Sequence, residues 1–130
     1  AAGRRTRPAD IPFVRETYIA HPEQILCSVA LGDDNAVLGF QSLKRAWDGN
    51  PYGVMPGWGI IGTHIHPDVA RQGVGRALFI ETVKAARAAG LIAIDASIGK
   101  DNAVAQAYYE AMGFRTYRET ERTVCKAFTP

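Results

Sequence analysis

The residues best suited to chemistry lie around a short glycine-containing segment at positions 65–76. The chain leaves a predicted strand at Ile65, passes Pro67, and enters a predicted helix through Gly73 and Gly75. Glycines allow successive backbone N–H groups to converge on one point, and a helix start adds further N–H donors and a positive dipole end. The segment therefore predicts a pyrophosphate-binding turn, with a ligand-free glycine-rich turn as the alternative.

Two common phosphate-binding motifs do not fit this segment. A dinucleotide-binding fingerprint needs a third glycine or an alanine at the position that Leu78 occupies. A P-loop needs Gly-Lys-Ser/Thr, and the only Gly-Lys pair, Gly99-Lys100, is followed by Asp101. The turn therefore fits neither of these two motifs.

Two motifs of this chain resemble those of the GNAT acetyltransferases. The first, Arg/Gln-x-x-Gly-x-Gly/Ala, is similar to residues 70–75, with one departure: Ala70 stands at the Arg/Gln position, and Arg71 and Gln72 follow it. The second, Asn-x-x-Ala-x-x-x-Tyr-x-x-x-Gly-Phe, matches at Asn102, Ala105, Tyr109, Gly113 and Phe114. The resemblance covers roughly residues 25–118.

The resemblance implies acetyl-CoA as co-substrate and no metal. In the family, backbone amides of the turn hold the pyrophosphate, the asparagine contacts the pantetheine arm, and a strand N–H, here that of Ile65, bonds the thioester carbonyl. The implied cofactor-binding residues are Ile65, Arg71, Gln72, Gly73, Val74, Gly75, Arg76, Asn102 and Tyr109. Asn102 is also a suitable helix N-cap.

The resemblance also makes Tyr109 the candidate catalytic acid. In relatives the aligned tyrosine protonates the departing thiolate, and a phenol with a pKa of ~10 suits that task better than a carboxylic acid. Helical spacing puts Tyr108 and Tyr109 on neighbouring faces, and the sequence alone does not tell which phenol faces the cofactor. Packing is the alternative role for either ring, and we expect Tyr108→Phe to be nearly silent.

The attacking amine must lose a proton, and His64 is the candidate base. Strand alternation places His64 and His66 on one face, opposite Thr63 and Ile65. A structural role for His64 is the alternative. The glutamate that some relatives carry earlier in this strand is absent, because Gly59 and Ile61 lie there. A water-mediated base, or one from the N-terminal region, therefore stays open.

The elements that must position these residues follow from periodicity and turn residues. They are a helix over 10–20, hairpin strands over 25–31 and 36–43, an irregular loop over 44–57, a strand over 58–66, a helix over 73–89, a strand over 91–97, a helix over 102–112, and strands over 114–117 and 123–128. This order predicts one α+β domain over residues 1–130. Its GNAT-like sheet is mixed, mainly antiparallel and twisted, with flanking helices and a central β-α-β acyl-CoA-binding crossover whose two strands are parallel.

The N-terminal region departs from the family pattern of a strand and two helices before the hairpin. Only about 24 residues precede the hairpin here. Either residues 4–8 are a residual first strand with shortened helices, or the usual first strand and helix are absent.

Composition excludes several other classes of protein. The 130 residues are 47% hydrophobic and 22% charged, with a net charge of +2 that gives no reason to expect nucleic-acid binding. No apolar run approaches the ~20 residues of a membrane span, and the start lacks a signal-peptide pattern, so a cytoplasmic protein is expected. Cys27 and Cys125 form no C-x-x-C pair and are expected to be buried thiols.

The resemblance implies direct acetyl transfer from acetyl-CoA to a primary amine, and the expected acceptor is a small molecule such as an amino acid or an amino-acid analogue. The resemblance is to the small-amine branch of the family. A wall of the acceptor pocket is expected from Trp47, Tyr52, Met55 and Trp58. The alternatives are a non-catalytic acyl-CoA-binding or sensor module and a protein acetyltransferase acting on lysine or an N-terminus. A homodimer is left open.

Overall fold

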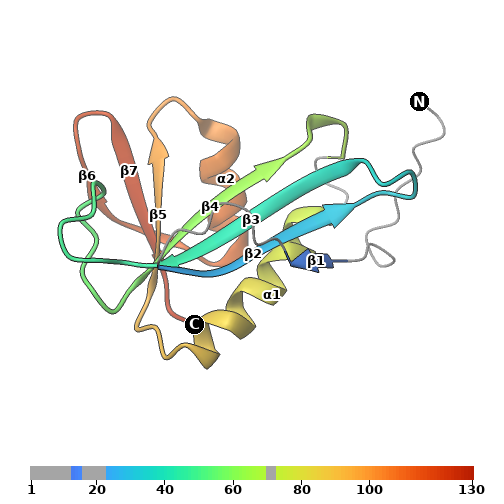
Figure 1. The fold of residues 1–130 in the computed structure, drawn as a ribbon. Coiled ribbons are helices and arrows are strands. Elements are labelled where there is room, and N and C mark those ends of the chain that lie inside the picture. The colour runs from blue at the N-terminus through green and yellow to red at the C-terminus, as the bar shows by residue number, and fades with distance from the viewer. Residues whose placement is uncertain (1–12, 16–22, 70–72) are drawn as a thin grey trace.

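The computed structural model of the chain describes residues 13–15, 23–69 and 73–130. Within these residues the strands form one seven-stranded sheet in the order β1-β2-β3-β4-β5-β7-β6 (Figure 1). The elements are β1 (Phe13–Arg15), β2 (Gln24–Leu31), β3 (Val37–Arg45), β4 (Gly59–Ile65), the short 3-10 helix η2 (Pro67–Val69), α1 (Val74–Ala88), β5 (Ile94–Gly99), α2 (Ala103–Met112), β6 (Arg115–Glu119) and β7 (Thr123–Phe128). The predicted α+β class and mixed sheet are confirmed.

The predicted N-terminal helix is wrong over the residues that the structure describes there. Phe13–Arg15 form strand β1, which pairs antiparallel with β2 from Phe13↔Ala30 to Arg15↔Ser28. The apolar spacing is too short to distinguish a helix from a strand, and pairing along the edge of β2 satisfies the backbone of this segment instead. The rest of the predicted helix, and residues 4–8, lie outside the described residues.

The hairpin and the strands that follow it agree with the prediction. Gly32 donates its N–H to Ala36 O at 2.9 Å, and Asn35 adopts the left-handed conformation with φ 63° that closes the turn between β2 and β3. β3 then pairs antiparallel with the whole of β4, from Gly39↔Ile65 to Arg45↔Gly59. This pairing gives β4 a rigid neighbour on one side.

The other neighbour of β4 is β5, and the two strands separate soon after they meet. They run parallel, as predicted for the crossover through α1, but pair only at Gly59↔Ile94 and Ile60↔Asp95. Beyond that point β4 stays with β3, while β5 stays with β7 from Ile94↔Phe128 to Gly99↔Thr123. Figure 1 shows the two strands diverging from a common point, which leaves a wedge-shaped opening in the sheet.

Helices α1 and α2 cover one face of the sheet. The main apolar cluster joins Phe79 and Ala86 of α1 to Tyr109 of α2 and to alternate residues of β5, namely Ile94, Ala96 and Ile98. The residues of β5 between them, Asp95 and Ser97, therefore face the other side. We call that side, which the helices do not cover, the open face; the loop after β3 packs against part of it through Val54 and Trp58.

A buried cation ties α2 to the last strand. Lys126 of β7 is 2% exposed, and its Nζ donates to Glu110 Oε2 and to Thr116 Oγ1, both at 2.7 Å. The two cysteines are buried as predicted, and Cys27 on β2 is separated from Cys125 on β7 by three strands of the sheet. No helix within the described part of the chain is long and apolar enough to cross a membrane.

Candidate functional site

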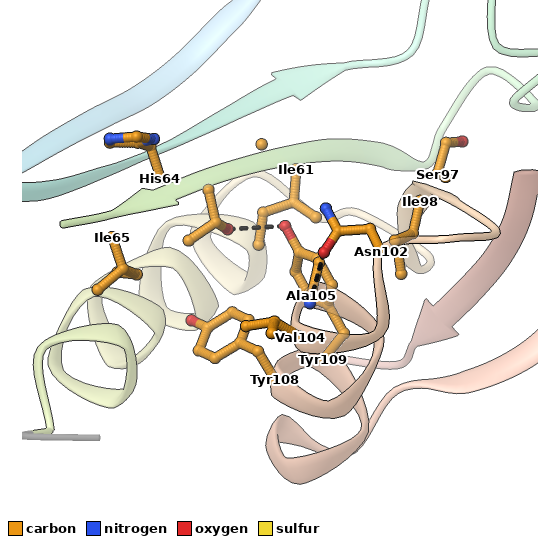
Figure 2. A pocket seen from close by; sticks show the side chains of 13 residues that line it. Ile61, His64, Ile65, Ser97, Ile98, Asn102, Val104, Ala105, Tyr108 and Tyr109 are labelled. Carbon is orange, nitrogen blue, oxygen red and sulfur yellow. Dashed lines mark hydrogen bonds between the residues drawn. The ribbon is translucent and has the colours of Figure 1, made fainter. Parts of the chain in front are cut away.

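A cavity of about 400 Å³ occupies the opening between β4 and β5 (Figure 2). This volume is within the range of small-molecule sites. Its walls come from β4, from β5 and the turn after it, and from α2; the lining residues are Ile61, Gly62, Thr63, His64, Ile65, Ser97, Ile98, Gly99, Asn102, Val104, Ala105, Tyr108 and Tyr109. The cavity exists because two strands that begin as neighbours take different partners.

The backbone of β4 presents polar groups to this cavity. His66 donates its N–H to Leu38 O at 2.7 Å, which fixes the alternation of the β3–β4 ladder. In such a ladder every second residue turns its N–H and C=O away from the partner strand. Thr63 and Ile65 therefore direct these groups toward the β5 side of the strand. They lie beyond the last β4–β5 pair, where β5 no longer pairs with β4. Two backbone N–H groups are thus available to a ligand lying along β4.

The predicted phosphate turn leads directly into α1. Gly73 is its N-cap in the left-handed region, with φ 85° and no side-chain cap, so glycine is required by backbone conformation. Helix α1 begins at Val74, whose side chain is 1% exposed, and Arg76 in the first turn is exposed. Backbone N–H groups and the positive dipole end are what this turn offers an anion. Arg71 and Gln72 lie outside the described residues.

The structure explains glycine at position 75 by a different contact from the expected one with a pyrophosphate. A Cβ atom at this position would lie 2.5 Å from Tyr108 Cε1, a distance that real structures do not show. The glycine therefore lets the Tyr108 ring of α2 lie directly against the first turn of α1. Close packing of an aromatic ring accounts for Gly75 before any ligand is considered.

A chain of hydrogen bonds links the phosphate turn to the candidate acid. Tyr108 Oη donates to Gly75 O at 2.7 Å and accepts from Gln41 Nε2 at 3.0 Å. The same Gln41 Nε2 donates to Thr63 Oγ1 at 3.0 Å, and Tyr109 Oη donates to that oxygen at 2.7 Å. Tyr108 is therefore a structural connector rather than a simple covering residue.

Gln41 is a residue that sequence reasoning missed. It is fully buried on β3, and its Oε1 accepts a hydrogen bond from the buried Thr82 hydroxyl of α1. All of its amide groups are therefore used. Its place two residues before Leu43, on the core-facing side of the strand, is the signal that could have identified it.

Tyr109 lies deeper than a solvent-facing acid would. Its side chain is 5% exposed, and its ring packs edge-on against Phe114 at 5.1 Å. Burial raises the pKa of Tyr109 to about 12; the Thr63 hydrogen bond opposes the rise and the charge of Asp95 adds to it. The phenol therefore stays neutral at physiological pH and releases its proton less readily than a free tyrosine.

Asn102 has the capping role that the sequence allowed. It is the N-cap of α2, and its Oδ1 accepts the N–H of Ala105 at 3.0 Å (Figure 2). It also lines the cavity. A cap and a ligand contact are compatible, because the side-chain amide nitrogen is not needed for the cap.

His64 lines the same cavity from the opposite side of β4. Figure 2 shows it across the strand from Ile65, Tyr108 and Tyr109. Its ring stacks on Phe40, with centroids 5.5 Å apart. The neighbouring His66 accepts the N–H of Asp68 through Nδ1 at 3.1 Å, outside the cavity. The structure therefore brings His64 and Tyr109 to one cavity but on different faces of the sheet.

The predicted aromatic wall does not line this cavity. Trp47 and Trp58 pack around Ala46, Val54 and Ile60 on the open face, and Tyr52 and Met55 are 47% and 65% exposed. None of the four lines the opening between β4 and β5. The two tryptophans therefore pack the loop onto the sheet, whereas Tyr52 and Met55 face solvent. No group of three or more potential metal ligands occurs among the residues whose positions are described.

A family comparison matches most of the chain. The model of the acetyltransferase (GNAT) family covers residues 3–114. No curated protein matches the chain.

Solved structures with a similar fold include three acetyltransferases. The IAA acetyltransferase from Bacillus cereus has a TM-score of 0.73 at 16% identity, covering 93% of this chain and 100% of that protein. A putative streptothricin acetyltransferase from Bacillus anthracis in complex with acetyl coenzyme A has a TM-score of 0.70 at 21% identity, covering 87% and 67%. The PaiA N-acetyltransferase from Thermoplasma acidophilum in complex with coenzyme A has a TM-score of 0.68 at 16% identity. The alignment with PaiA covers 83% of this chain but only 62% of that protein, so the chain spans less than two thirds of its length.

Proposed function

This chain belongs to the acetyltransferase (GNAT) family, and on that premise we propose that it is an acetyl-CoA-dependent N-acetyltransferase. The observation that carries the proposal is the cavity between β4 and β5. It contains Tyr109 and Asn102, and Tyr108 connects it to the phosphate turn. A long, thin ligand with a phosphate group at one end and a reactive group at the other fits that arrangement.

The residues around the cavity suit acetyl-CoA. The N–H groups at Gly73, Val74, Gly75 and Arg76 would hold the pyrophosphate at the start of α1. Thr63 and Ile65 would bond the pantetheine arm and the thioester carbonyl through their backbone, and Asn102 would contact the arm from α2. Arg71 and Gln72 complete the proposed set, although they lie outside the described residues.

The proposed chemistry is direct attack of a primary amine on the thioester. A backbone N–H of β4 polarises the carbonyl by electrostatic stabilisation of the oxyanion-hole kind. Tyr109 donates a hydrogen bond, and then a proton, to the departing sulfur. Its hydroxyl hydrogen is directed at Thr63 Oγ1, so the hydroxyl must rotate by torsion about its C–O bond to reach the sulfur.

Neither thiol is suited to carry an acetyl group. Cys27 is 3% exposed and Cys125 is 1% exposed, and neither lines the cavity. A nucleophilic cysteine needs access and a stabilised thiolate. Direct transfer without a covalent enzyme intermediate therefore agrees with the geometry.

We propose that the acceptor is a primary amine of a small molecule, such as an amino acid or an amino-acid analogue. We also propose that this chain acts in the cytoplasm and has no nucleic-acid or membrane partner. The proton acceptor proposed from the sequence is His64, which lines the cavity on the open face. Whether the chain forms a homodimer is decided by sedimentation. The engaged hydroxyl and raised pKa of Tyr109 favour one rival, a non-catalytic acyl-CoA-binding module.

Two measurements test the proposal in sequence. Acetyl-CoA should raise the melting temperature by mass action, with a stabilisation of about 2.7 kcal/mol when the ligand is at 100 times its Kd. Pantetheine alone, which lacks the pyrophosphate, is the matched control and should stabilise far less. No stabilisation by millimolar acetyl-CoA would refute the proposal.

Release of free CoA in the presence of amines then separates the candidate functions. An amino-acid and small-amine panel should give turnover, and peptides with a free N-terminus or a lysine should give much less. Turnover with peptides only would identify a protein acetyltransferase. Binding of acetyl-CoA without turnover on either panel would identify the non-catalytic module.

A further inference from the structure

A buried carboxylate lies where β4 and β5 separate. Asp95 is 0% exposed, and no other carboxylate among the described residues is buried. It forms the last pair of the β4–β5 ladder, opposite Ile60, so it stands at the apex of the opening. Burial of a carboxylate is unfavourable unless hydrogen bonds compensate, and groups of this kind concentrate at functional sites.

Both oxygens of Asp95 accept hydrogen bonds from hydroxyl groups. Ser97 Oγ donates to Oδ2 at 2.8 Å, and Tyr117 Oη donates to Oδ1 at 2.7 Å. Trp58 packs against the Tyr117 ring, with the ring centroids 5.2 Å apart. The carboxylate is thus held in one orientation from two sides.

Ser97 connects this buried group to the cavity. Strand alternation puts Asp95 and Ser97 on the open face of β5, and Ser97 is exposed and lines the cavity. Figure 2 shows Ser97 on the same side of the strands as His64, away from Tyr109. A molecule that enters the cavity from the open face therefore meets the Ser97 hydroxyl, with a carboxylate directly behind it.

The surroundings of Asp95 favour its protonated form. Burial raises the pKa of Asp95, and the hydrogen bonds from Tyr117 and Ser97 and the charge of Arg118 oppose that rise. The titratable and charged groups around Asp95 and Ser97 are Tyr117 and Arg118 on β6, Cys125 on β7 and Tyr109 on α2. A carboxylate of raised pKa binds a proton more strongly than an exposed one, as a proton acceptor should.

We propose that Ser97 and Asp95 form a relay that takes the proton from the acceptor amine, an inference that rests on the proposed N-acetyltransfer. As the new C–N bond forms and the C–S bond breaks, Ser97 Oγ accepts one proton from the nitrogen and passes its own proton to Asp95 Oδ2. Asp95 becomes a neutral carboxylic acid that still accepts the Tyr117 hydrogen bond. Asp95 then passes its proton back through Ser97 to water, and Tyr109, which has given its proton to the sulfur, takes one from water. Both residues are thereby restored, and in each turnover nitrogen loses one proton and sulfur gains one.

This arrangement has a feature that His64 lacks in the described structure. Proton transfer is efficient when the group that contacts the substrate is oriented by a second group behind it. Ser97 has such a group at hydrogen-bond distance, whereas the His64 ring is stacked on the apolar face of Phe40. The relay therefore assigns proton removal to β5 rather than to β4.

The kinetic test compares Asp95→Asn, Ser97→Ala, Tyr117→Phe and His64→Gln in CoA release, using an amine that the wild-type protein acetylates. Asp95→Asn and Ser97→Ala should lower kcat by about 10²-fold or more, the usual contribution of a general base. Their Kd for acetyl-CoA should stay within about twofold. Asp33→Asn, in the exposed hairpin turn, is the matched control and should keep the wild-type rate.

The pH profile separates a relay from a merely structural role. The Tyr117 hydrogen bond lowers the pKa of Asp95, so Tyr117→Phe should move the acid limb of kcat/KM to higher pH. The alkaline plateau should fall far less than in Asp95→Asn. The same amine is used throughout, so its own titration cancels in the comparison.

A second readout does not depend on turnover. Because the pKa of Asp95 is higher in the folded than in the unfolded state, the wild-type protein loses stability as the pH rises between the two values. The melting temperature of Asp95→Asn, relative to wild type, should therefore increase from pH 4 to pH 8. A difference that does not change with pH would overturn the relay.

The remaining outcomes are distinguishable. If the wild-type protein acetylates an amine and both Asp95→Asn and Ser97→Ala retain its kcat within threefold, the relay is wrong and the proposed function stands. A loss of activity in His64→Gln alone would assign proton removal to His64. If the wild-type protein binds acetyl-CoA and acetylates nothing, the proposed function fails and the relay fails with it.

Discussion

Replacing Gly75 with alanine should destabilise this protein, although alanine is the better residue for a helix. At an ordinary helical position the change from glycine to alanine is favourable by about 1 kcal/mol. Here the new Cβ would lie 2.5 Å from Cε1, 3.2 Å from Cζ and 3.3 Å from Cδ1 of Tyr108. The ring must move, because the other side of the contact is the backbone of α1.

The expected cost follows from what the ring movement disrupts. Overpacking of a well-packed contact typically costs about 1–3 kcal/mol. The bond from Tyr108 Oη to Gly75 O and the bond from Gln41 Nε2 to Tyr108 Oη are also lost or lengthened, at about 1 kcal/mol for each net hydrogen bond. After the helix-propensity gain of about 1 kcal/mol is subtracted, a net loss of about 2–4 kcal/mol is expected. For a chain of 130 residues the melting temperature should fall by roughly 7–15 °C.

Urea and thermal unfolding of a double-mutant cycle provide the assay. Tyr108→Ala alone removes ring packing and should also destabilise the protein. In the double variant Gly75→Ala/Tyr108→Ala the clash no longer exists and the two hydrogen bonds are already lost, so the two losses should not add, with a coupling of about 3–5 kcal/mol. Gly62→Ala is the control, because its nearest neighbour would be the single Ser42 Oγ atom at 3.3 Å.

Two results would refute the reasoning. A Gly75→Ala variant that is more stable than the wild type would show that the ring contact does not constrain this position. Additive losses in the double variant would show that the two residues are not coupled. A third result would support the role that the sequence implied for Gly75. If the losses of stability are not additive, yet the double variant binds acetyl-CoA much more weakly than Tyr108→Ala does, then Gly75 is needed for the pyrophosphate.

Three further predictions use other parts of the molecule. Tyr109→Phe should lower kcat by about 10²–10⁴-fold at most while the Kd of acetyl-CoA from calorimetry changes little, because the phenol acts only on the departing sulfur; an unchanged kcat would make Tyr109 a packing residue. Cys27→Ser and Cys125→Ala should keep turnover in the folded fraction, and mass spectrometry should detect no acetyl group on either sulfur of the wild type. The hydrogen bond and charge of Lys126 lower the pKa of Glu110 in the folded protein. The Lys126–Glu110 pair therefore stabilises the fold above the unfolded pKa of Glu110, and this stabilisation is lost as the pH falls through the folded pKa. Glu110→Gln should abolish that loss when the melting temperature is measured against pH, and an unchanged pH dependence would contradict the assignment.

Most of the fold could be read from local patterns. The hairpin between β2 and β3, the helices α1 and α2 and the strands that follow them appear within a few residues of their predicted bounds. Turn residues and apolar periodicity act over short stretches of chain, so the sequence carries that information directly. The exception is β1, where three residues of ambiguous spacing take their conformation from the edge of β2.

The parts of the site that the sequence determined are those that depend on backbone conformation. The φ of 85° at Gly73 and the N-cap of Asn102 follow from residue type at a helix start. The second motif also identified Tyr109, which lines the cavity together with Tyr108, although the sequence left open which of the two phenols faces a ligand. Residue type and spacing were sufficient there because each feature is confined to one turn of chain.

Only the tertiary structure decided how distant segments meet. The separation of β4 from β5 depends on pairing with β3 and β7, and no local pattern encodes which partner a strand keeps. The contact of Tyr108 with Gly75 joins residues 33 positions apart, and that of Gln41 with Tyr108 joins residues 67 apart. The burial of Asp95 beneath Tyr117 likewise needs β6 folded back beside β7. Side-chain chemistry in this protein is set by such long-range contacts, because desolvation and hydrogen bonding depend on what surrounds a group in space rather than on what precedes it along the chain.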